Sequence, residues 1–191
     1  MLSLPLVITL LDLDDPLQQK MFRDRATVFK DRMGWDVNVT SEGFEMDQYD
    51  IPGLTQYLIF HDDKGNHLAS TRVTPVKEAC MAIAAFDGLC SLDMITEPES
   101  CMEITRFCVM DEDRDASRSR EVMLATAKHI CSSPRFKSGL AVFDKVMIRV
   151  YRRIGFEPTV LNQIGRLCVG QWTEEQYEEI LALDRQNKGL E

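Results

Sequence analysis

The sequence lacks long apolar runs, C-x-x-C pairs and an excess of basic residues, and each absence excludes a class of protein. The apolar start, MLSLPLVITLLDLDD, has no basic segment and no small-residue cleavage site, and it is too short to span a membrane. We therefore expect a buried first strand over about residues 6–11, in a cytoplasmic protein that has no membrane partner.

The six cysteines form no C-x-x-C pair, and the three histidines are scattered rather than placed at zinc-site spacing. We therefore expect reduced thiols, no disulfide framework and no metal site. The chain has 22 Lys and Arg against 31 Asp and Glu, a net charge of −9, which disfavours nucleic acid and anionic membranes as partners. Since no histidine is assigned to catalysis, we expect carboxylates to carry any proton transfer.

The residues that are present suffice for one globular domain. A chain of 191 residues that is 45% apolar can bury roughly 70% of its unfolded surface. No internal repeat or low-complexity segment divides it. We therefore assign residues 1–191 to a single domain.

The first half shows a helix, a loop and a hairpin. Asp14 or Asp15 before Pro16 is typical of a helix start, and we expect this helix over about 16–32. The acidic segment 35–53 has little periodicity and predicts a long loop, which in a compact domain usually has a function. Strands are expected over 55–60 and 67–74, joined by a DDKGN turn in which Gly65 and Asn66 suit positive φ.

The second half alternates between strands and helices. Residues 75–98 are ambiguous, with a short helix and then a loop over 86–94. We expect strands over 102–110, 139–143 and 160–169, helices over 121–131 and 145–154, and a charged loop over 111–120. Thr173 and Gln176 form a capping box that opens a helix over about 174–185.

Strict alternation in the strand over 102–110 places Ile104, Arg106 and Cys108 on one face. Glu103 and Thr105 then lie on the other face. A β-bulge in this strand would re-aim one of the charged side chains.

Charged residues interrupt an apolar helical face in the segment RATVFKDRMGWDVNVTSEGFEMDQYD. Met21, Arg25, Phe29 and Arg32 recur at the spacing of one helical stripe. A buried guanidinium needs a partner. The chain supplies acids at Glu45, Asp47, Asp50 and Glu103 and further arginines at Arg72 and Arg106.

Such a charged constellation is typical of an active site, because mutually perturbing charges are not needed for stability. The alternative interpretation is a set of buried ion pairs that only fix packing. Trp35 and Phe29 are then ordinary core anchors, and Asp47 and Asp50 only pair with Arg25 and Arg32.

These residues together resemble a known signature. The ordered set of charged and aromatic residues is similar to that of the acyl-homoserine-lactone synthases, the autoinducer synthases of quorum sensing. The likeness covers about the first 110 residues and is looser beyond them. The residues that carry it are Arg25, Phe29, Arg32, Trp35, Glu45, Asp47, Asp50, Arg72, Glu103 and Arg106. The run YRRIGF resembles the end of acetyltransferase domains. The resemblance implies an α/β fold, an acetyltransferase-like mixed central sheet flanked by helices, with a splayed active-site strand.

The resemblance also implies the reaction. An acyl group, carried as a thioester by acyl carrier protein or coenzyme A, is joined to the α-amine of S-adenosylmethionine, and lactonisation then expels methylthioadenosine. Both molecules are substrates, and no cofactor is expected. The residue types suit this chemistry, because the amine must lose a proton, the thioester oxygen needs a donor, and a sulfonium cation favours acids and aromatic faces.

The expected catalytic roles follow from this reaction. Glu103 is the candidate base or base-orienting group. Arg25 and Arg106 hold the methionine carboxylate or fix the acids, and Asp47 and Asp50 balance the cationic substrate. The residues expected to bind substrate are Phe29, Arg32, Trp35, Glu45, Arg72, Ala141 and Phe143.

Two finer expectations concern the acyl donor. Lys145, Arg149, Arg152 and Arg153 are expected to dock an acidic carrier protein, with a solvated helix face as the alternative. In the family, makers of 3-oxo chains commonly carry a threonine on the strand before this helix. The matching position here is Ala141, which offers no donor, so we expect an acyl chain without a 3-oxo group.

Two other functions remain open for this sequence. A coenzyme-A-dependent N-acetyltransferase usually has a glycine-containing loop after the central strand that cradles the pyrophosphate. Here the loop is DEDRDASRSR, without glycine, although Arg114, Arg118 and Arg120 offer cations to a phosphate. A non-catalytic small-molecule sensor of the same fold is disfavoured by the complete set of acids and arginines.

Overall fold

The computed structural model describes residues 6–110, 116–187 and 189. Within them the fold is α/β, with a mixed sheet in the strand order β1-β2-β3-β4-β5-β7-β6, which confirms the expected fold class. The strands are β1 Leu6–Leu10, β2 Gln56–His61, β3 His67–Pro75, β4 Cys101–Val109, β5 Ser138–Asp144, β6 Thr159–Ile164 and β7 Leu167–Trp172.

The chain forms two compact units. The first unit comprises Met1–Thr74 and Thr105–Val122, and the second comprises Pro75–Ile104 and Met123–Glu191. Strand β4 and helix α3 (Ala116–Ser132) contribute residues to both. The assignment of the whole chain to a single domain stays a prediction.

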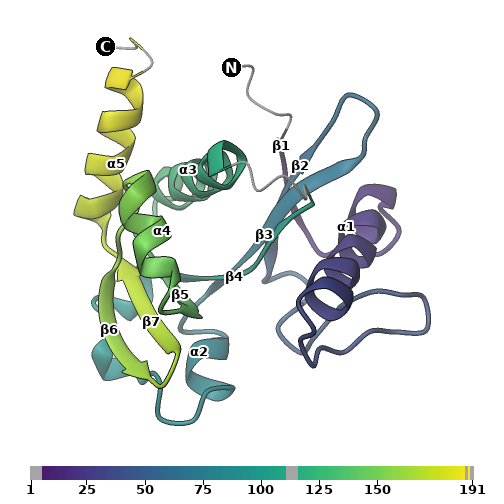
Figure 1. Ribbon diagram of the computed structural model, residues 1–191, viewed down its shortest axis with the longest axis horizontal. Helices are drawn as coiled ribbons and strands as arrows, with labels where there is room; N and C mark the ends of the chain where they lie inside the picture. Colours follow the sequence, from purple (N-terminus) through teal and green to yellow (C-terminus); the bar gives the residue numbers. More distant parts are fainter. Residues whose placement is uncertain (1–5, 111–115, 188, 190–191) are drawn as a thin grey trace. The chain divides into compact units, whose positions relative to one another are not determined.

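Helix α1 (Pro16–Ala26) covers the strands of the first unit (Figure 1). Asp15 caps it by accepting a hydrogen bond from the backbone N–H of Leu17 at 2.9 Å, and Pro16 occupies the first turn, as the sequence predicts. Its buried face packs Phe22 against Tyr57 of β2, with ring centroids 5.5 Å apart. The core of this unit therefore lies between α1 and β2.

The predicted helix over 16–32 is not α-helical throughout. Its last part, Thr27–Arg32, is a π-helix, in which the N–H of Met33 donates to the carbonyl of Val28 at 3.0 Å. Each π turn contains more residues than an α turn, so the stripe that begins at Met21 does not continue to Arg32.

The predicted hairpin is confirmed. Strand β2 pairs antiparallel with β1 and with β3, and Gly65 in the turn has φ of 75°. The N–H of Asp62 donates to the carbonyl of Asn66 at 2.9 Å, closing the turn. Tyr57 and Arg72 are cross-strand partners, so their side chains emerge on the same face of the sheet.

In the second unit, the start of β4 pairs parallel with β5, and β5 pairs antiparallel with β7. The predicted single strand over 160–169 is wrong, because the chain turns back at Gly165, where φ is 60°, and forms the β6–β7 hairpin. The ambiguous segment holds α2 (Met81–Ala84) and two 3₁₀ turns, Leu92–Met94 and Pro98–Ser100.

Helices α4 (Met147–Ile154) and α5 (Glu174–Asn187) complete the second unit (Figure 1). Tyr151 of α4 packs edge-on against Trp172, at 5.4 Å between ring centroids. The capping box of α5 is confirmed: the N–H of Thr173 donates to Oε1 of Gln176 at 2.9 Å. Gly139 permits close packing, since a Cβ there would lie 2.1 Å from the hydroxyl of Tyr177.

The predicted loop over 111–120 is shorter than expected, because α3 begins at Ala116. Arg114 lies outside the described residues, and Arg118 and Arg120 are helical. The six cysteines are unpaired. No helix in the described ranges is long and apolar enough to cross a membrane, and the same ranges hold no group of three or more His, Cys, Asp or Glu side chains suited to a metal ion.

Candidate active site

The first unit gathers six of the predicted charged residues into one ion cluster: Arg25, Glu45, Asp47, Asp50, Arg72 and Arg106. The cluster draws its members from α1, β3, β4 and the loop between α1 and β2. Arg25 is buried and donates from Nε to Glu45 at 2.7 Å and from Nη1 to Asp50 at 3.3 Å. The predicted pairing of Arg25 with these acids is therefore present.

Two further arginines close the cluster. Arg72 donates from Nη1 to Asp47 at 2.6 Å and from Nε to the hydroxyl of Thr105 at 2.8 Å. Arg106 donates from Nε to Glu45 at 2.9 Å and from Nη2 to Asp47 at 2.6 Å. Each acid thus bridges two arginines, and the three positive and three negative groups balance.

Burial and pairing act in opposite directions on these groups. Burial opposes the ionisation of Asp50, but Arg25 and Arg72 outweigh it and lower the pKa of Asp50 to about 2. Burial likewise disfavours the charged form of Arg72, but Asp50 and Asp47 raise its pKa above the ordinary value. Asp50 and Arg72 are therefore both charged at neutral pH.

The backbone of β4 is irregular at Arg106. This residue has φ of 51°, in the left-handed region that costs a residue with a side chain roughly 1–2 kcal/mol. The predicted alternation fails there, because Thr105 and the adjacent Arg106 both contact the ion cluster. The regular alternation predicted for this strand is therefore wrong at Arg106, and the β-bulge that would re-aim a charged side chain stays a prediction.

Two aromatic side chains lie next to the cluster. Phe29 is buried and stacks on Trp35, with ring centroids 5.2 Å apart and planes 5° from parallel. The guanidinium of Arg106 lies 5.7 Å from the centroid of Phe29. Trp35 is 50% exposed, so this stack offers an accessible aromatic surface beside the charges.

Arg32 does not join the ion cluster, contrary to its predicted place on the buried stripe. Its side chain is exposed and donates from Nη2 to the carbonyl of Val109 at 2.9 Å. The π-helical turn is the physical reason, since it moves Arg32 away from the face that carries Arg25. The proposed pairing of Arg32 with Asp47 or Asp50 is therefore wrong.

Glu103 lies in the second unit, where backbone amides bind its carboxylate. The N–H of Met81 donates to Oε2 at 2.7 Å and the N–H of Ala82 to Oε1 at 2.6 Å. The residue is 2% exposed. Both carboxylate oxygens of Glu103 are therefore held by backbone amides at the start of α2.

The predicted acyl-site residues lie on β5. Ala141 and Phe143 are both buried and two residues apart, so they share a face of this strand. Ala141 pairs with Gly170 of β7. Phe143 packs edge-on against Tyr151, with ring centroids 5.1 Å apart.

The basic residues expected to dock a carrier are all exposed: Lys145, Arg149, Arg152 and Arg153. Helix α4 begins at Met147, two residues later than predicted, so Lys145 lies in the preceding turn. Arg152 is bound by Glu157, with Nε donating at 2.9 Å. The neighbouring Val150 is 41% exposed, which adds an apolar contact to this basic surface.

Sequence reasoning missed two residues that hold the ion cluster in place. The hydroxyl of Tyr57 donates to Asp50 at 2.8 Å, and the hydroxyl of Thr105 accepts from Arg72. In the sequence Tyr57 is an ordinary strand residue, because nothing local distinguishes a core tyrosine from one that binds a carboxylate. Only the β2–β3 register shows its role.

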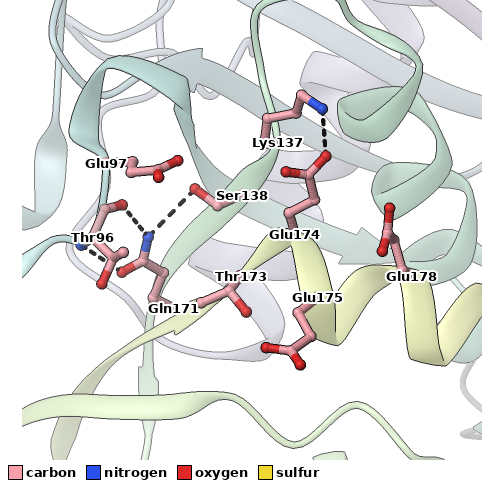
Figure 2. A pocket seen from close by; sticks show the side chains of 9 residues that line it. All are labelled: Thr96, Glu97, Lys137, Ser138, Gln171, Thr173, Glu174, Glu175 and Glu178. Carbon is pink, nitrogen blue, oxygen red and sulfur yellow. Dashed lines mark hydrogen bonds and ion pairs between the residues drawn. The ribbon is translucent and has the colours of Figure 1, made fainter.

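The second unit also contains a polar hollow of about 510 Å³ (Figure 2). The buried amide of Gln171 is saturated there, donating to the carbonyl of Thr96 at 2.7 Å and accepting from its N–H at 2.9 Å. An acyl chain gains stability only from apolar burial, which this lining does not provide. The residues that line it are Thr96, Glu97, Lys137, Ser138, Gln171, Thr173, Glu174, Glu175 and Glu178.

Known proteins match this chain over most of its length. The family model described as autoinducer synthase matches residues 10–186. An acyl-homoserine-lactone synthase of Rhizobium etli is 33% identical over 170 residues, which are 85% of this chain and 80% of that protein. One from Agrobacterium fabrum (strain C58 / ATCC 33970) is 34% identical over 174 residues, 83% of this chain and 82% of the relative.

Solved structures share the fold. The structure of BjaI, a CoA-dependent acyl-homoserine lactone synthase, with MTA superimposes with a TM-score of 0.74 at 18% identity. The superposition covers 93% of this chain and 84% of that one.

Proposed function

Because the chain belongs to the autoinducer synthase family of acyltransferases, we propose that it makes an acyl-homoserine lactone from S-adenosylmethionine and an acyl thioester. The observation that carries the proposal is the ion cluster, in which six residues of the predicted signature contact one another. The BjaI structure with MTA supports it, since MTA is the expected by-product. No cofactor takes part, because both molecules are consumed as substrates.

The reaction has two steps. The amine nitrogen of S-adenosylmethionine attacks the thioester carbonyl, loses a proton, and expels the thiol of the carrier. An oxygen of the α-carboxylate then attacks the γ-carbon, and the carbon–sulfur bond breaks with its electron pair on sulfur. Neutral methylthioadenosine leaves, and the acylated lactone remains.

The ion cluster provides a fixed electrostatic site for the sulfonium substrate. Its charges are already paired, so they do not have to reorganise when the substrate arrives. Asp47, whose side chain is 19% exposed, faces the cationic substrate, whereas Asp50 is fully enclosed and orients Arg25 and Arg72. The Phe29–Trp35 stack offers its aromatic surface to the sulfonium.

Glu103 directs the deprotonation of the amine. Two backbone amides fix the orientation of its carboxylate, which serves as the base, or orients the base, for the proton that the amine must lose. This role needs a negative charge at a fixed position. An uncharged side chain of the same shape does not supply it.

The acyl donor arrives on a carrier that docks at α4. An acyl carrier protein is acidic, and the exposed Arg149 and Arg153 with the adjacent Val150 suit a surface of this kind despite the net charge of −9. In the acyl site, Ala141 offers no hydrogen-bond donor. The product therefore carries a chain without a 3-oxo group.

The test is a reconstitution with purified protein. It is incubated with S-adenosylmethionine and either hexanoyl coenzyme A or hexanoyl acyl carrier protein, and lactone and methylthioadenosine are measured by mass spectrometry. Equimolar release of both products is expected, faster from the carrier protein. Transfer of the acyl group to an amine other than that of S-adenosylmethionine identifies an N-acyltransferase instead, and binding without turnover identifies a sensor.

A further inference from the structure

Strands β4 and β5 are paired over a short length only. Three residue pairs join them, of which the last is Glu103 with Leu140. Ala141, the next residue of β5, pairs with Gly170 of β7 but has no partner on β4 among the described residues. The proposed acyl site at Ala141 therefore lies where the two strands part.

Tyr177 of α5 fills the space just before this point. Gly139 precedes Ala141 by two residues on β5, so both residues face the same side of the sheet, about 7 Å apart. A Cβ added to Gly139 would overlap the hydroxyl of Tyr177 and lie 2.7 Å from Cδ1 of Ile104. The hydroxyl of Tyr177 therefore lies directly against the backbone of Gly139, on the face that carries Ala141.

The environment of Tyr177 is enclosed and apolar. The residue lies on the buried face of α5 and is 2% exposed. Its backbone N–H donates to the carbonyl of Thr173 at 3.0 Å, in the first turn of the helix. Burial raises the pKa of Tyr177 well above its ordinary value, so the hydroxyl is uncharged at neutral pH. An uncharged, enclosed ring is suited to limit an apolar chain by its volume rather than to bind a charged group.

Phe143 bounds Ala141 in the opposite direction along β5. It follows Ala141 by two residues and faces the same side of the sheet. Its ring lies over Gly170, since a Cβ added there would be 2.9 Å from Cε1 of Phe143. The edge-on contact with Tyr151 holds this ring in place. The side chain of Ala141 is thus bounded by Phe143 toward the end of β5 and by Tyr177 toward its start.

We propose that Tyr177 sets the longest acyl chain that this protein transfers, an inference that rests on the proposed function. Phe143 blocks the direction toward the end of β5, so an acyl chain at Ala141 extends toward Gly139. Because Gly139 has no side chain, the acyl chain lies close to the backbone until it meets the hydroxyl of Tyr177. A longer chain has to displace this ring, and one surplus methylene in a hydrophobic pocket changes kcat/KM by about 10- to 200-fold. Tyr177 is thus a specificity-determining residue and takes no part in the chemistry.

The experiment shortens this side chain and measures the chain-length profile, which is the dependence of kcat/KM on the length of a saturated acyl chain. Purified wild type, Tyr177→Phe and Tyr177→Leu are assayed with S-adenosylmethionine and coenzyme A thioesters from butanoyl to dodecanoyl. Calorimetric titration with the same thioesters, without S-adenosylmethionine, gives their affinities in the absence of turnover. Ile180→Val is the control, because it removes one methylene group from the same buried face of α5. Thermal unfolding shows that each variant is folded.

Tyr177→Phe removes the oxygen that lies against Gly139. We expect it to raise kcat/KM about tenfold for the first acyl chain that is too long for wild type. Tyr177→Leu removes the whole ring and is expected to extend the chain-length profile by at least one further two-carbon step. The KM for S-adenosylmethionine should be unchanged in both variants, and Ile180→Val should keep the wild-type profile.

Gly139→Ala tests the same space from the opposite side. Its added methyl group overlaps the hydroxyl of Tyr177 in the wild-type background, but Tyr177→Leu removes that hydroxyl. The double variant Gly139→Ala/Tyr177→Leu is expected to return the profile to shorter chains, because the methyl group fills part of the vacated space. A profile that stays extended in the double variant shows that the acyl chain does not lie at Gly139, and it overturns the inference.

The other outcomes separate this inference from the proposed function. Folded Tyr177→Phe and Tyr177→Leu variants with the wild-type profile overturn the inference, while lactone made by the wild type leaves the proposed function standing. An equal extension in Ile180→Val also overturns it, since the effect is then a general loosening under α5. If the wild type makes no lactone, the proposed function fails and the calorimetric affinities decide: a shift toward longer chains in both Tyr177 variants supports the inference, and unchanged affinities overturn it.

Discussion

Replacing Asp50 by asparagine removes the acid on which two buried arginines depend. Asp50 accepts hydrogen bonds from Arg25 at 3.3 Å, from the hydroxyl of Tyr57 at 2.8 Å and from the N–H of Asp47 at 2.8 Å. It also pairs with Arg72 at 3.1 Å. The substitution keeps the shape of the side chain but leaves these arginines short of one negative charge.

The pKa of Asp50 sets the size of the pH-linked effect. Relative to its ordinary value of 3.8, this pKa is lowered to about 2 by its arginine partners against the cost of burial. At about 1.36 kcal/mol per pKa unit, the difference corresponds to roughly 2 kcal/mol. Since the folded-state pKa lies below the unfolded one, this stability is present above about pH 4 and is lost as the pH falls through about 2.

Urea unfolding between about pH 5 and pH 2 measures the effect. At the upper end Asp50→Asn is expected to lose about 3–5 kcal/mol, the usual cost of breaking a buried ion pair. Over the acid range the wild type is expected to lose roughly 2 kcal/mol more than the variant, because the variant has no carboxyl to protonate at this position.

The matched control for this experiment is Tyr57→Phe, which removes one donor to Asp50 and keeps every charge of the ion cluster. We expect it to cost about 1.5–3 kcal/mol, as for a hydrogen bond to a charged group, and to retain most of the acid dependence. If wild type and Asp50→Asn show parallel stability curves over this pH range, the assignment of a lowered pKa to Asp50 is refuted.

Three further predictions concern activity. Glu103→Gln is expected to fold with a free energy of unfolding about 1–3 kcal/mol lower, because the amide group of the glutamine must face one backbone N–H with its own donors. The variant should lose nearly all acyl transfer. Wild-type turnover in the folded variant contradicts the catalytic role of Glu103. Charge reversal at Arg149 and Arg152 should raise KM for the carrier-bound donor and leave the kinetics with S-adenosylmethionine unchanged. Most of the effect should come from Arg149, since Glu157 already binds Arg152. An unchanged salt dependence of KM argues against docking at α4. Ala141→Thr should introduce 3-oxo lactones in culture extracts. A wild-type extract rich in 3-oxo lactones contradicts the expectation that alanine at this position excludes a 3-oxo chain.

Local sequence was sufficient where a structure depends on neighbouring residues. The start of α1 at Asp15 and Pro16 and the turn at Gly65 are set by capping and by backbone conformation. Their signals lie within a few residues of the structure that they determine. The same holds for the stripe that buries Arg25 and Phe29.

Where two side chains meet across the fold, the sequence predicted the members of the ion cluster but not their pairing. It supplied all six members, because a buried charge requires an opposite one, but it also named Arg32 and Glu103, which are not among these six. It did not show that Arg72 and Arg106 share Asp47, or that Tyr57 donates to Asp50. Those contacts depend on strand register and on the loop before β2.

The sequence by itself determined that charges are buried in this protein and which residue types carry them, since periodicity and desolvation act along the chain. Only the tertiary structure decided that Arg32 faces away, that Arg106 takes a left-handed conformation, and that the segment after Gly155 makes two strands. A π-helical turn, a positive φ and a strand reversal each have a local cost. They persist because contacts between distant residues compensate it, and such contacts have no local signal in the sequence.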